Sequence, residues 1–256
     1  MFGISIRNLP KLLSVIILFI SIVLLGFLLI GCLDTTSQYS KVYLAQFQFN
    51  QTSIDNLSST NVTTPIESLS IKINYLGVCF DMSNNITCST FTKMANMTEI
   101  NGIPLNSSPN NQPNIVTIAK TFSNICHPRI LIATLLLNLI LLLTICYSHL
   151  PIEPGKLYVK KFNCIMSLII SLLWGLGAML QQEAVDVTTQ MVREASMYYL
   201  SVSAGTRAQA MTWTIFAFSL IVTIGSIFAC FKYETRSQSQ SQPQPQPQQL
   251  PYLAKV

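Results

Sequence analysis

Residues 12–31 read LLSVIILFISIVLLGFLLIG, an apolar run that contains no charged side chain. A helix of about 20 such residues crosses the ~30 Å hydrocarbon core of a bilayer. Because a helix that is apolar on every face has no side for water to solvate, this run predicts a membrane span. Three more uncharged runs follow at 130–149, 162–180 and 211–231. With 50% hydrophobic and 10% charged residues, the chain is too apolar for an ordinary soluble domain.

Charge predicts on which side of the membrane each connecting segment lies. Segments 1–11, 150–161 and 232–256 are rich in Lys and Arg, whereas 32–129 and 181–210 together carry slightly more acids than bases. The positive-inside rule therefore places both termini in the cytosol and the other two segments outside the cell. Basic residues beside anionic lipid explain the net charge of +5, so no nucleic-acid partner is expected. The cytosolic cations are Arg7, Lys11, Lys156, Lys160, Lys161, Lys232, Arg236 and Lys255.

Potential N-glycosylation sites are confined to the first outer segment, 32–129. Oligosaccharyl transferase reaches an Asn-x-Ser/Thr sequon only in the lumen of the secretory pathway. The cluster therefore predicts a glycosylated extracellular loop in a eukaryotic plasma membrane, and it agrees with the orientation derived from charge. The predicted acceptors are Asn50, Asn56, Asn61, Asn85, Asn96 and Asn106.

Four cysteines lie in the outer segment 32–129, where the environment is oxidising. Four cysteines allow three pairings, and an even number outside the cell favours disulfides. We favour Cys79–Cys88, which are close in sequence, and Cys32–Cys126, which lie at the outer ends of the first two spans.

Three further cysteines lie at the inner ends of the spans: Cys146, Cys164 and Cys230. Cysteines in that position are candidates for S-palmitoylation. The alternative interpretation is that they are small apolar residues packed within the helix ends.

The first outer segment contains strand patterns. Residues 43–49 and 69–75 alternate apolar and polar side chains with a period of two, and a third short run covers 86–91. These runs predict a small antiparallel sheet with Cys79–Cys88 bridging a hairpin. Residues 101–114 predict an exposed loop, and 181–200 predict a helical extension of the third span. The Ser-, Gln- and Pro-rich tail within 232–256 predicts a disordered tether.

No catalytic, metal or cofactor site is predicted. His127 and His149 lie near opposite faces of the membrane, and no GxSxG, HExxH or phosphate-binding Gly-rich motif occurs. The spans lack the ionisable residues that ion pathways usually carry. Asn138 in the second span predicts a hydrogen bond between helices. The outer acids predict solvated surface rather than a calcium-attracting mouth: Asp81, Glu183, Asp186 and Glu194.

Residues 74–88, NYLGVCFDMSNNITC, resemble the claudin superfamily, whose members have four spans and a paired-cysteine signature in a large first outer loop. Among claudin-like groups the chain is most similar to the fungal factor-induced-gene family, whose signature begins Gly-hydrophobic-hydrophobic-Gly-x-Cys. Gly77, Cys79 and Cys88 match that signature, and Asn74 replaces its first Gly. The resemblance implies an all-α membrane protein, a claudin-like four-transmembrane-helix bundle with a small antiparallel extracellular β-sheet in the first loop.

The resemblance also implies a function. Members of the factor-induced-gene family are induced by mating pheromone, regulate low-affinity calcium influx and support membrane fusion. We therefore expect a non-enzymatic plasma-membrane protein whose partners are membrane lipids, a second copy or a calcium channel, and proteins on the opposing cell. Two alternatives stay open, a claudin-like organiser of membrane domains of the eisosome or pH-sensing type and a small cation channel.

Overall fold

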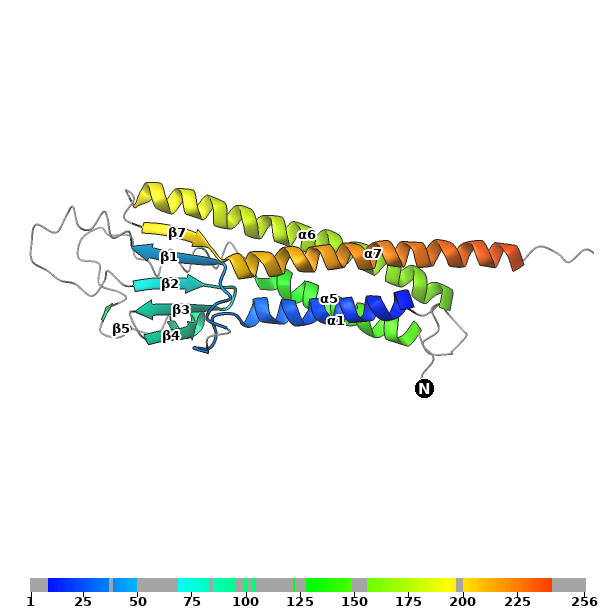
Figure 1. Cartoon of the computed structure of the whole chain (residues 1–256), viewed down its shortest axis with the longest axis horizontal. Helices are drawn as coiled ribbons and strands as arrows, with labels where there is room; N and C mark the ends of the chain where they lie inside the picture. Colours follow the sequence, from blue (N-terminus) through cyan, green and yellow to red (C-terminus); the bar gives the residue numbers. More distant parts are fainter. Residues whose placement is uncertain are drawn as a thin grey trace, which may run out of the picture.

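Four long helices and one sheet make up most of the protein, whose structure is a computed structural model (Figure 1). Each of the four helices is long and apolar enough to cross a membrane, so the chain is a multi-pass membrane protein. They are α1 (Leu9–Ile30), α5 (Pro128–Ser148), α6 (Lys156–Ala195) and α7 (Thr206–Gln240). The structure describes residues 9–36, 39–49, 69–82, 85–94, 99–100, 103–104, 122, 128–148, 156–196 and 200–240.

The four helices form a ring in which α1 contacts α5 and α7, and α6 contacts the same two helices. α1 begins and α7 ends at the end of the bundle opposite to the sheet (Figure 1). α6 has 40 residues, which is about 60 Å of helix. That length is about twice the hydrocarbon thickness, so α6 continues beside the sheet. The end of the bundle that carries the sheet is called the outer end below (Figure 1). The helical extension predicted after the third span is therefore confirmed as far as Ala195.

Five antiparallel strands form the outer sheet in the order β4-β3-β2-β1-β7. The strands expected from alternation in the first loop are present, and β3 supplies the partner for β4 in the cysteine-bearing hairpin. A two-stranded sheet is formed by β5 (Glu99–Ile100) and β6 (Ile103–Pro104); β5 ends just before the segment 101–114, predicted to be an exposed loop, and β6 lies within that segment. The main strands are β1 (Ala45–Phe49), β2 (Leu69–Ile73), β3 (Gly77–Met82), β4 (Asn85–Thr90) and β7 (Leu200–Ala204); a short helix, α3 (Phe91–Met94), follows β4.

The edge strand β7 differs from our prediction, because the strands were expected only in the first outer segment and β7 comes from the second. We expected helix as far as residue 200, but the amide of Leu200 donates to the hydroxyl of Ser196 and the chain turns back into a strand. β7 then pairs with β1 over the full length of both strands, from Ala45 opposite Ala204 to Phe49 opposite Leu200. The sheet therefore ties both outer segments together.

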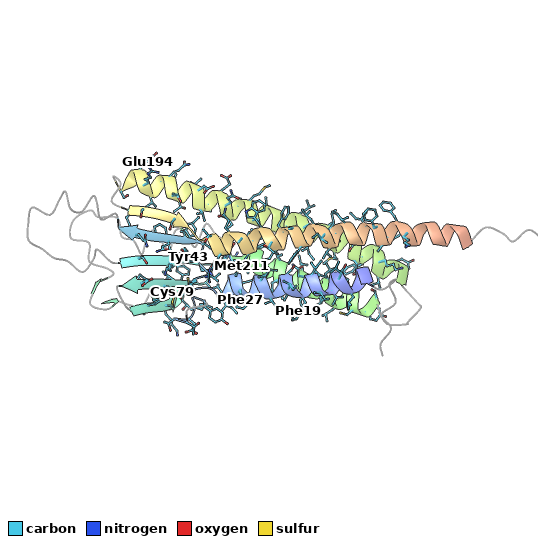
Figure 2. The ribbon with its side chains drawn as sticks, viewed as in Figure 1. Phe19, Phe27, Tyr43, Cys79, Glu194 and Met211 are labelled. Atoms are coloured by element: carbon cyan, nitrogen blue, oxygen red, sulfur yellow. A yellow bond between two sulfur atoms is a disulfide. The ribbon has the colours of Figure 1, made fainter. Side chains whose placement is uncertain are left out.

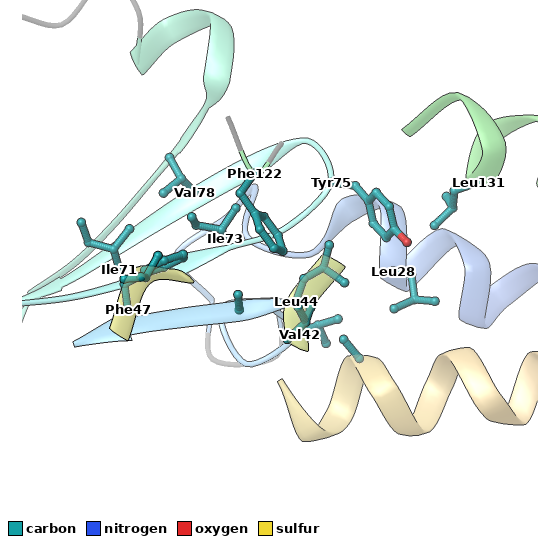
Figure 3. Packing of buried hydrophobic residues seen from close by; sticks show 14 of the residues in the cluster. Leu28, Val42, Leu44, Phe47, Ile71, Ile73, Tyr75, Val78, Phe122 and Leu131 are labelled. Atoms are coloured by element: carbon teal, nitrogen blue, oxygen red, sulfur yellow. The ribbon is translucent and has the colours of Figure 1, made fainter. Parts of the chain in front are cut away.

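The main core lies where the sheet meets the outer ends of the helices (Figure 3). Alternating side chains of β1 and β2 are buried as predicted, among them Phe47, Ile71 and Ile73. Phe47 contacts the ring of Phe122 edge-on, with ring centroids 6.5 Å apart. The same cluster includes side chains from α1, α5, α6 and α7. Sheet and bundle therefore share one continuous hydrophobic core, so we expect them to move as one body.

One hydrogen-bonded link between the sheet and the bundle lies at the outer end of α1. Cys32, just after α1, has a left-handed φ of 58°, and its amide bonds to Tyr39 rather than to the helix. The carbonyl of Leu28, one of the last four of α1, instead accepts a 2.8 Å hydrogen bond from the Asn74 side chain in the β2–β3 turn. Asn74 therefore caps a helix that precedes it by more than forty residues.

We expect Asn74→Leu to reduce stability by about 1–3 kcal/mol, because it leaves the buried carbonyl of Leu28 without a partner. Asn138→Leu is the matched control: Asn138 is equally buried, but it donates to Thr134 O within its own helix. Thermal unfolding of the purified chain in detergent measures both. Equal losses in the two variants would contradict the capping role of Asn74.

Candidate functional site at the sheet–bundle junction

The paired-cysteine motif forms one hairpin of the sheet. Cys79 in β3 stands directly opposite Cys88 in β4, and the two are joined by a disulfide with their Cα atoms 4.0 Å apart. The predicted pairing of these two residues is therefore present. Closing a loop of this size contributes about 3 kcal/mol in the chain-entropy model. Figure 2 shows Cys79 within the sheet, beyond the end of α1, while the Glu194 end of α6 extends past it.

Gly77 is required by a close approach of two backbones. A Cβ atom at this position would collide with the carbonyl oxygen of Cys32, which follows α1. Gly77 also accepts the amide of Asn74 across the β2–β3 turn, at 2.9 Å. The matching glycine of the motif therefore lets the turn lie directly on the end of α1.

A buried polar network continues from this turn into the bundle. The hydroxyl of Tyr75 donates to Gln181 Oε1 of α6 at 2.9 Å, and Thr212 of α7 lies 3.1 Å from the same oxygen. The indole nitrogen of Trp174 donates to the backbone carbonyl of Thr212 at 3.1 Å. All four residues are buried. Satisfied networks of this kind, in a low dielectric, hold their elements in one arrangement, here the sheet against α6 and α7.

The outer acids do not converge on one site. Asp81 of β3 forms an ion pair with Lys72 at 2.8 Å. Strands β2 and β1 lie between β3 and β7, and β7 is the strand next to α6, which carries the other three acids. Glu194 lies at the outer tip of α6 (Figure 2). Within the described ranges, no group of three or more His, Cys, Asp or Glu side chains could hold a metal ion. The partly exposed Lys72–Asp81 pair contributes little to stability, at most about 1 kcal/mol.

Several polar side chains of the bundle bond to each other or to backbone, whereas the buried Oδ1 of Asn163 in α6 has no hydrogen-bond partner. Ser171 of α6 and Thr223 of α7 share a 2.7 Å hydrogen bond between the two helices. Asn138 differs from our prediction, because its side chain bonds to Thr134 of its own helix rather than to another helix. A Cβ at Gly175 would press on the ring of Phe216, so this glycine permits close packing of α6 and α7. The helices therefore pack without a ligand-sized gap at these positions.

Comparison with known proteins identifies the family. Residues 56–232 match the model of the family described as "Ca2+ regulator and membrane fusion protein Fig1". The Factor-induced gene 1 protein of Saccharomyces cerevisiae is 30% identical over an alignment 248 residues long, which includes 85% of this chain and 83% of the relative. The chain belongs to the Fig1 family. The match includes the disulfide hairpin, the β2–β3 turn and most or all of three of the four long helices. The family is described as a calcium regulator and membrane fusion protein, and not as an enzyme.

Cys32 differs from our prediction that it forms a disulfide with Cys126. Cys32 is a free thiol that is fully buried, so the structure does not contain the predicted Cys32–Cys126 bridge; Cys126 lies outside the described residues. The thiol of Cys32 lies 3.6 Å from the carbonyl of Val42, to which it donates. Burial raises the pKa of Cys32 to about 12, against a smaller opposing effect of Lys72.

The structure describes few of the predicted modification sites of the Fig1-family chain. Asn85 begins β4, and the other five sequon asparagines, Asn50, Asn56, Asn61, Asn96 and Asn106, lie outside the described residues. Cys146 is exposed on α5, whereas Cys164 and Cys230 are partly buried. Glycosylation and palmitoylation stay predictions.

We expect Tyr75→Phe to destabilise the chain by about 1 kcal/mol, because it removes one buried hydrogen bond at nearly constant volume. Gln181→Leu and the double variant complete a double-mutant cycle, measured by thermal unfolding in detergent. A coupling energy between 0.5 and 3 kcal/mol, roughly the range for residues in direct contact, is expected. Strict additivity of the two substitutions would show that the two side chains do not interact.

We expect Cys32 in the native protein to resist alkylation at pH 8, because the reactive thiolate is disfavoured by burial. The folded pKa lies above the unfolded one, so this group's contribution to stability is complete below pH 9 and is lost as pH rises toward 12. Mass spectrometry should detect alkylated Cys32 after denaturation without reductant, with exposed Cys146 as the reactive control. Alkylation that requires prior reduction would show that Cys32 is disulfide-bonded.

Proposed function

We propose that this chain acts in the plasma membrane of a mating fungal cell, where it regulates low-affinity calcium influx and promotes cell–cell membrane fusion. The observation that carries the proposal is the family match over residues 56–232, whose description names both activities. The name of the yeast relative, a factor-induced gene product, supports expression in response to an external signal.

The orientation belongs to the same proposal. The Lys- and Arg-rich segments face the cytosol together with both termini, and the sheet with its sequons faces outward. The sheet then meets the opposing cell surface, while the helices contact lipid, a second copy or a calcium channel. The function is non-enzymatic and needs no cofactor.

The packing of the bundle supports regulation over conduction by one chain. Trp174 and Ile215 are each 1% exposed, and both belong to the core between α6 and α7. The hydroxyls of Ser167, Ser219 and Thr223 bond to backbone carbonyls of the helices. An ion in this interior would lose its hydration without gaining charged ligands. Calcium influx would therefore pass through a partner channel.

The mechanism that we propose rests on the rigid sheet–bundle junction. A protein bound by the sheet can bias the helices because Asn74 contacts α1, and Tyr75 contacts α6 through Gln181. The neighbouring disulfide holds the β3–β4 hairpin in shape. Engagement of the opposing cell would thus be transmitted to whatever contacts the helices in the membrane.

The first test is deletion of the gene and restoration by this chain in pheromone-treated mating cells, with calcium uptake and fusion efficiency as readouts. We expect both to fall on deletion and to recover on restoration. Normal values after deletion would overturn the proposal and favour the membrane-domain organiser. Calcium current from the purified chain alone in a bilayer would instead support the small cation channel.

In the same cells we expect the double variant Cys79→Ser/Cys88→Ser to lower the surface level and, per molecule at the surface, fusion. Loss of about 3 kcal/mol of loop constraint loosens the hairpin that carries the outer face. Cys146→Ser, on the inner end of α5, is the matched control for cysteine replacement, scored by surface biotinylation and fusion counts. Full fusion by the double variant would refute a role for the hairpin.

A further inference from the structure

A small pocket lies between the outer parts of α6 and α7, beside the sheet. Its cavity volume is about 20 Å³, which is room for one water-sized group. The backbone of Gly205 and the side chain of Leu44 close the side next to the sheet. The polar and aromatic lining comes from Gln181, Gln182, Asp186, Gln209, Thr212 and Trp213.

The pocket lies at the boundary between hydrocarbon and water on the sheet side of the membrane. The uncharged run of α6 ends at Leu180, and that of α7 begins at Met211. Ala178 and Trp213 therefore border the pocket from the hydrocarbon side, and Asp186 borders it from the aqueous side. Trp213 is 39% exposed, as is common for indoles at this level of a bilayer.

The hydrogen-bonding groups of the pocket select a hydroxyl. Gln181 lines the pocket and is 7% exposed; its Oε1 receives the hydroxyls of Tyr75 and Thr212, and its amide Nε2 is a donor. The carboxylate of Asp186, an exposed residue of the lining, can only accept. A hydroxyl can accept from Gln181 and donate to Asp186. A phosphate would be repelled by Asp186, and an ammonium cannot accept from the amide.

The size of the pocket and the residues around it further restrict the chemical group that the pocket can hold. A phosphate-based headgroup is larger than a space for one water-sized group, whereas a lone hydroxyl fits. On the hydrocarbon side, Trp213 contacts the ring of Phe216 edge-on at 5.9 Å, and Met179 and Leu220 are exposed to lipid. Together they offer an apolar surface to a rigid lipid body that continues from the hydroxyl.

We propose that this pocket binds the hydroxyl of a membrane sterol, whose ring system lies against Trp213 on the lipid-facing side of α6 and α7. A sterol combines a single hydroxyl with a rigid apolar body, which loses little conformational entropy on binding. The site joins two helices and the sheet, because Gln181 also holds Tyr75. The proposal goes beyond the proposed function and does not rest on it.

The test uses the full chain in lipid nanodiscs with a photoreactive, clickable sterol. We expect labelling within residues 178–213 that is displaced by unlabelled sterol. The sterol methyl ether, which accepts but cannot donate a hydrogen bond, should compete about tenfold less well. Equal competition by the ether, or labelling confined to other segments, would overturn the proposal. Labelling no stronger than that of an unrelated four-span protein would mean that the pocket holds water, and would also overturn it.

Two variants with matched chemistry sharpen the result. Asp186→Ala removes the acceptor of the pocket, and Glu183→Ala removes a carboxylate from α6 that does not line it; both residues are exposed, so folding should be preserved. We expect about tenfold less displaceable labelling for Asp186→Ala and no change for Glu183→Ala, with equal elution volumes for both. Equal labelling of the two variants would contradict the assignment.

Discussion

The capping of α1 by the β2–β3 turn is the contact that joins the outer sheet to the membrane bundle. The last carbonyls of any helix lack partners within that helix, and at the membrane boundary an unpaired carbonyl is costly. Asn74 supplies the donor for Leu28, Gly77 provides the clearance, and the left-handed Cys32 turns the chain away. These three features place Tyr75 where it can reach α6.

The Fig1-family chain is closely packed around that contact. One hydrophobic cluster includes strands and all four long helices, and the polar residues within the bundle are hydrogen-bonded largely to backbone. Close packing of this kind is typical of protein interiors.

Much of the fold could be predicted because the governing signals are local. Four uncharged runs long enough to span a bilayer allow no soluble alternative, and alternation in β1 and β2 marks the buried face through Phe47, Ile71 and Ile73. The pairing of Cys79 with Cys88 follows from their proximity in sequence and the hairpin between them. The junction is harder to predict, because Asn74 departs from a glycine of the motif and its hydrogen-bond partner lies on a helix far away in the sequence.

The sequence by itself determined that this chain spans a membrane four times, carries a small disulfide-bonded sheet and resembles the fungal factor-induced-gene family. The signals for these features are the length of the apolar runs, the alternation of apolar and polar residues, and the paired-cysteine motif, and each depends on residues close together in the sequence. Only the tertiary structure decided that Leu200–Ala204 completes the sheet, that Cys32 is a buried thiol, and that Tyr75, Gln181 and Thr212 meet. Each of these depends on contacts between residues far apart in the chain, and the free energy of burying and pairing them is gained only when the helices and the sheet are assembled.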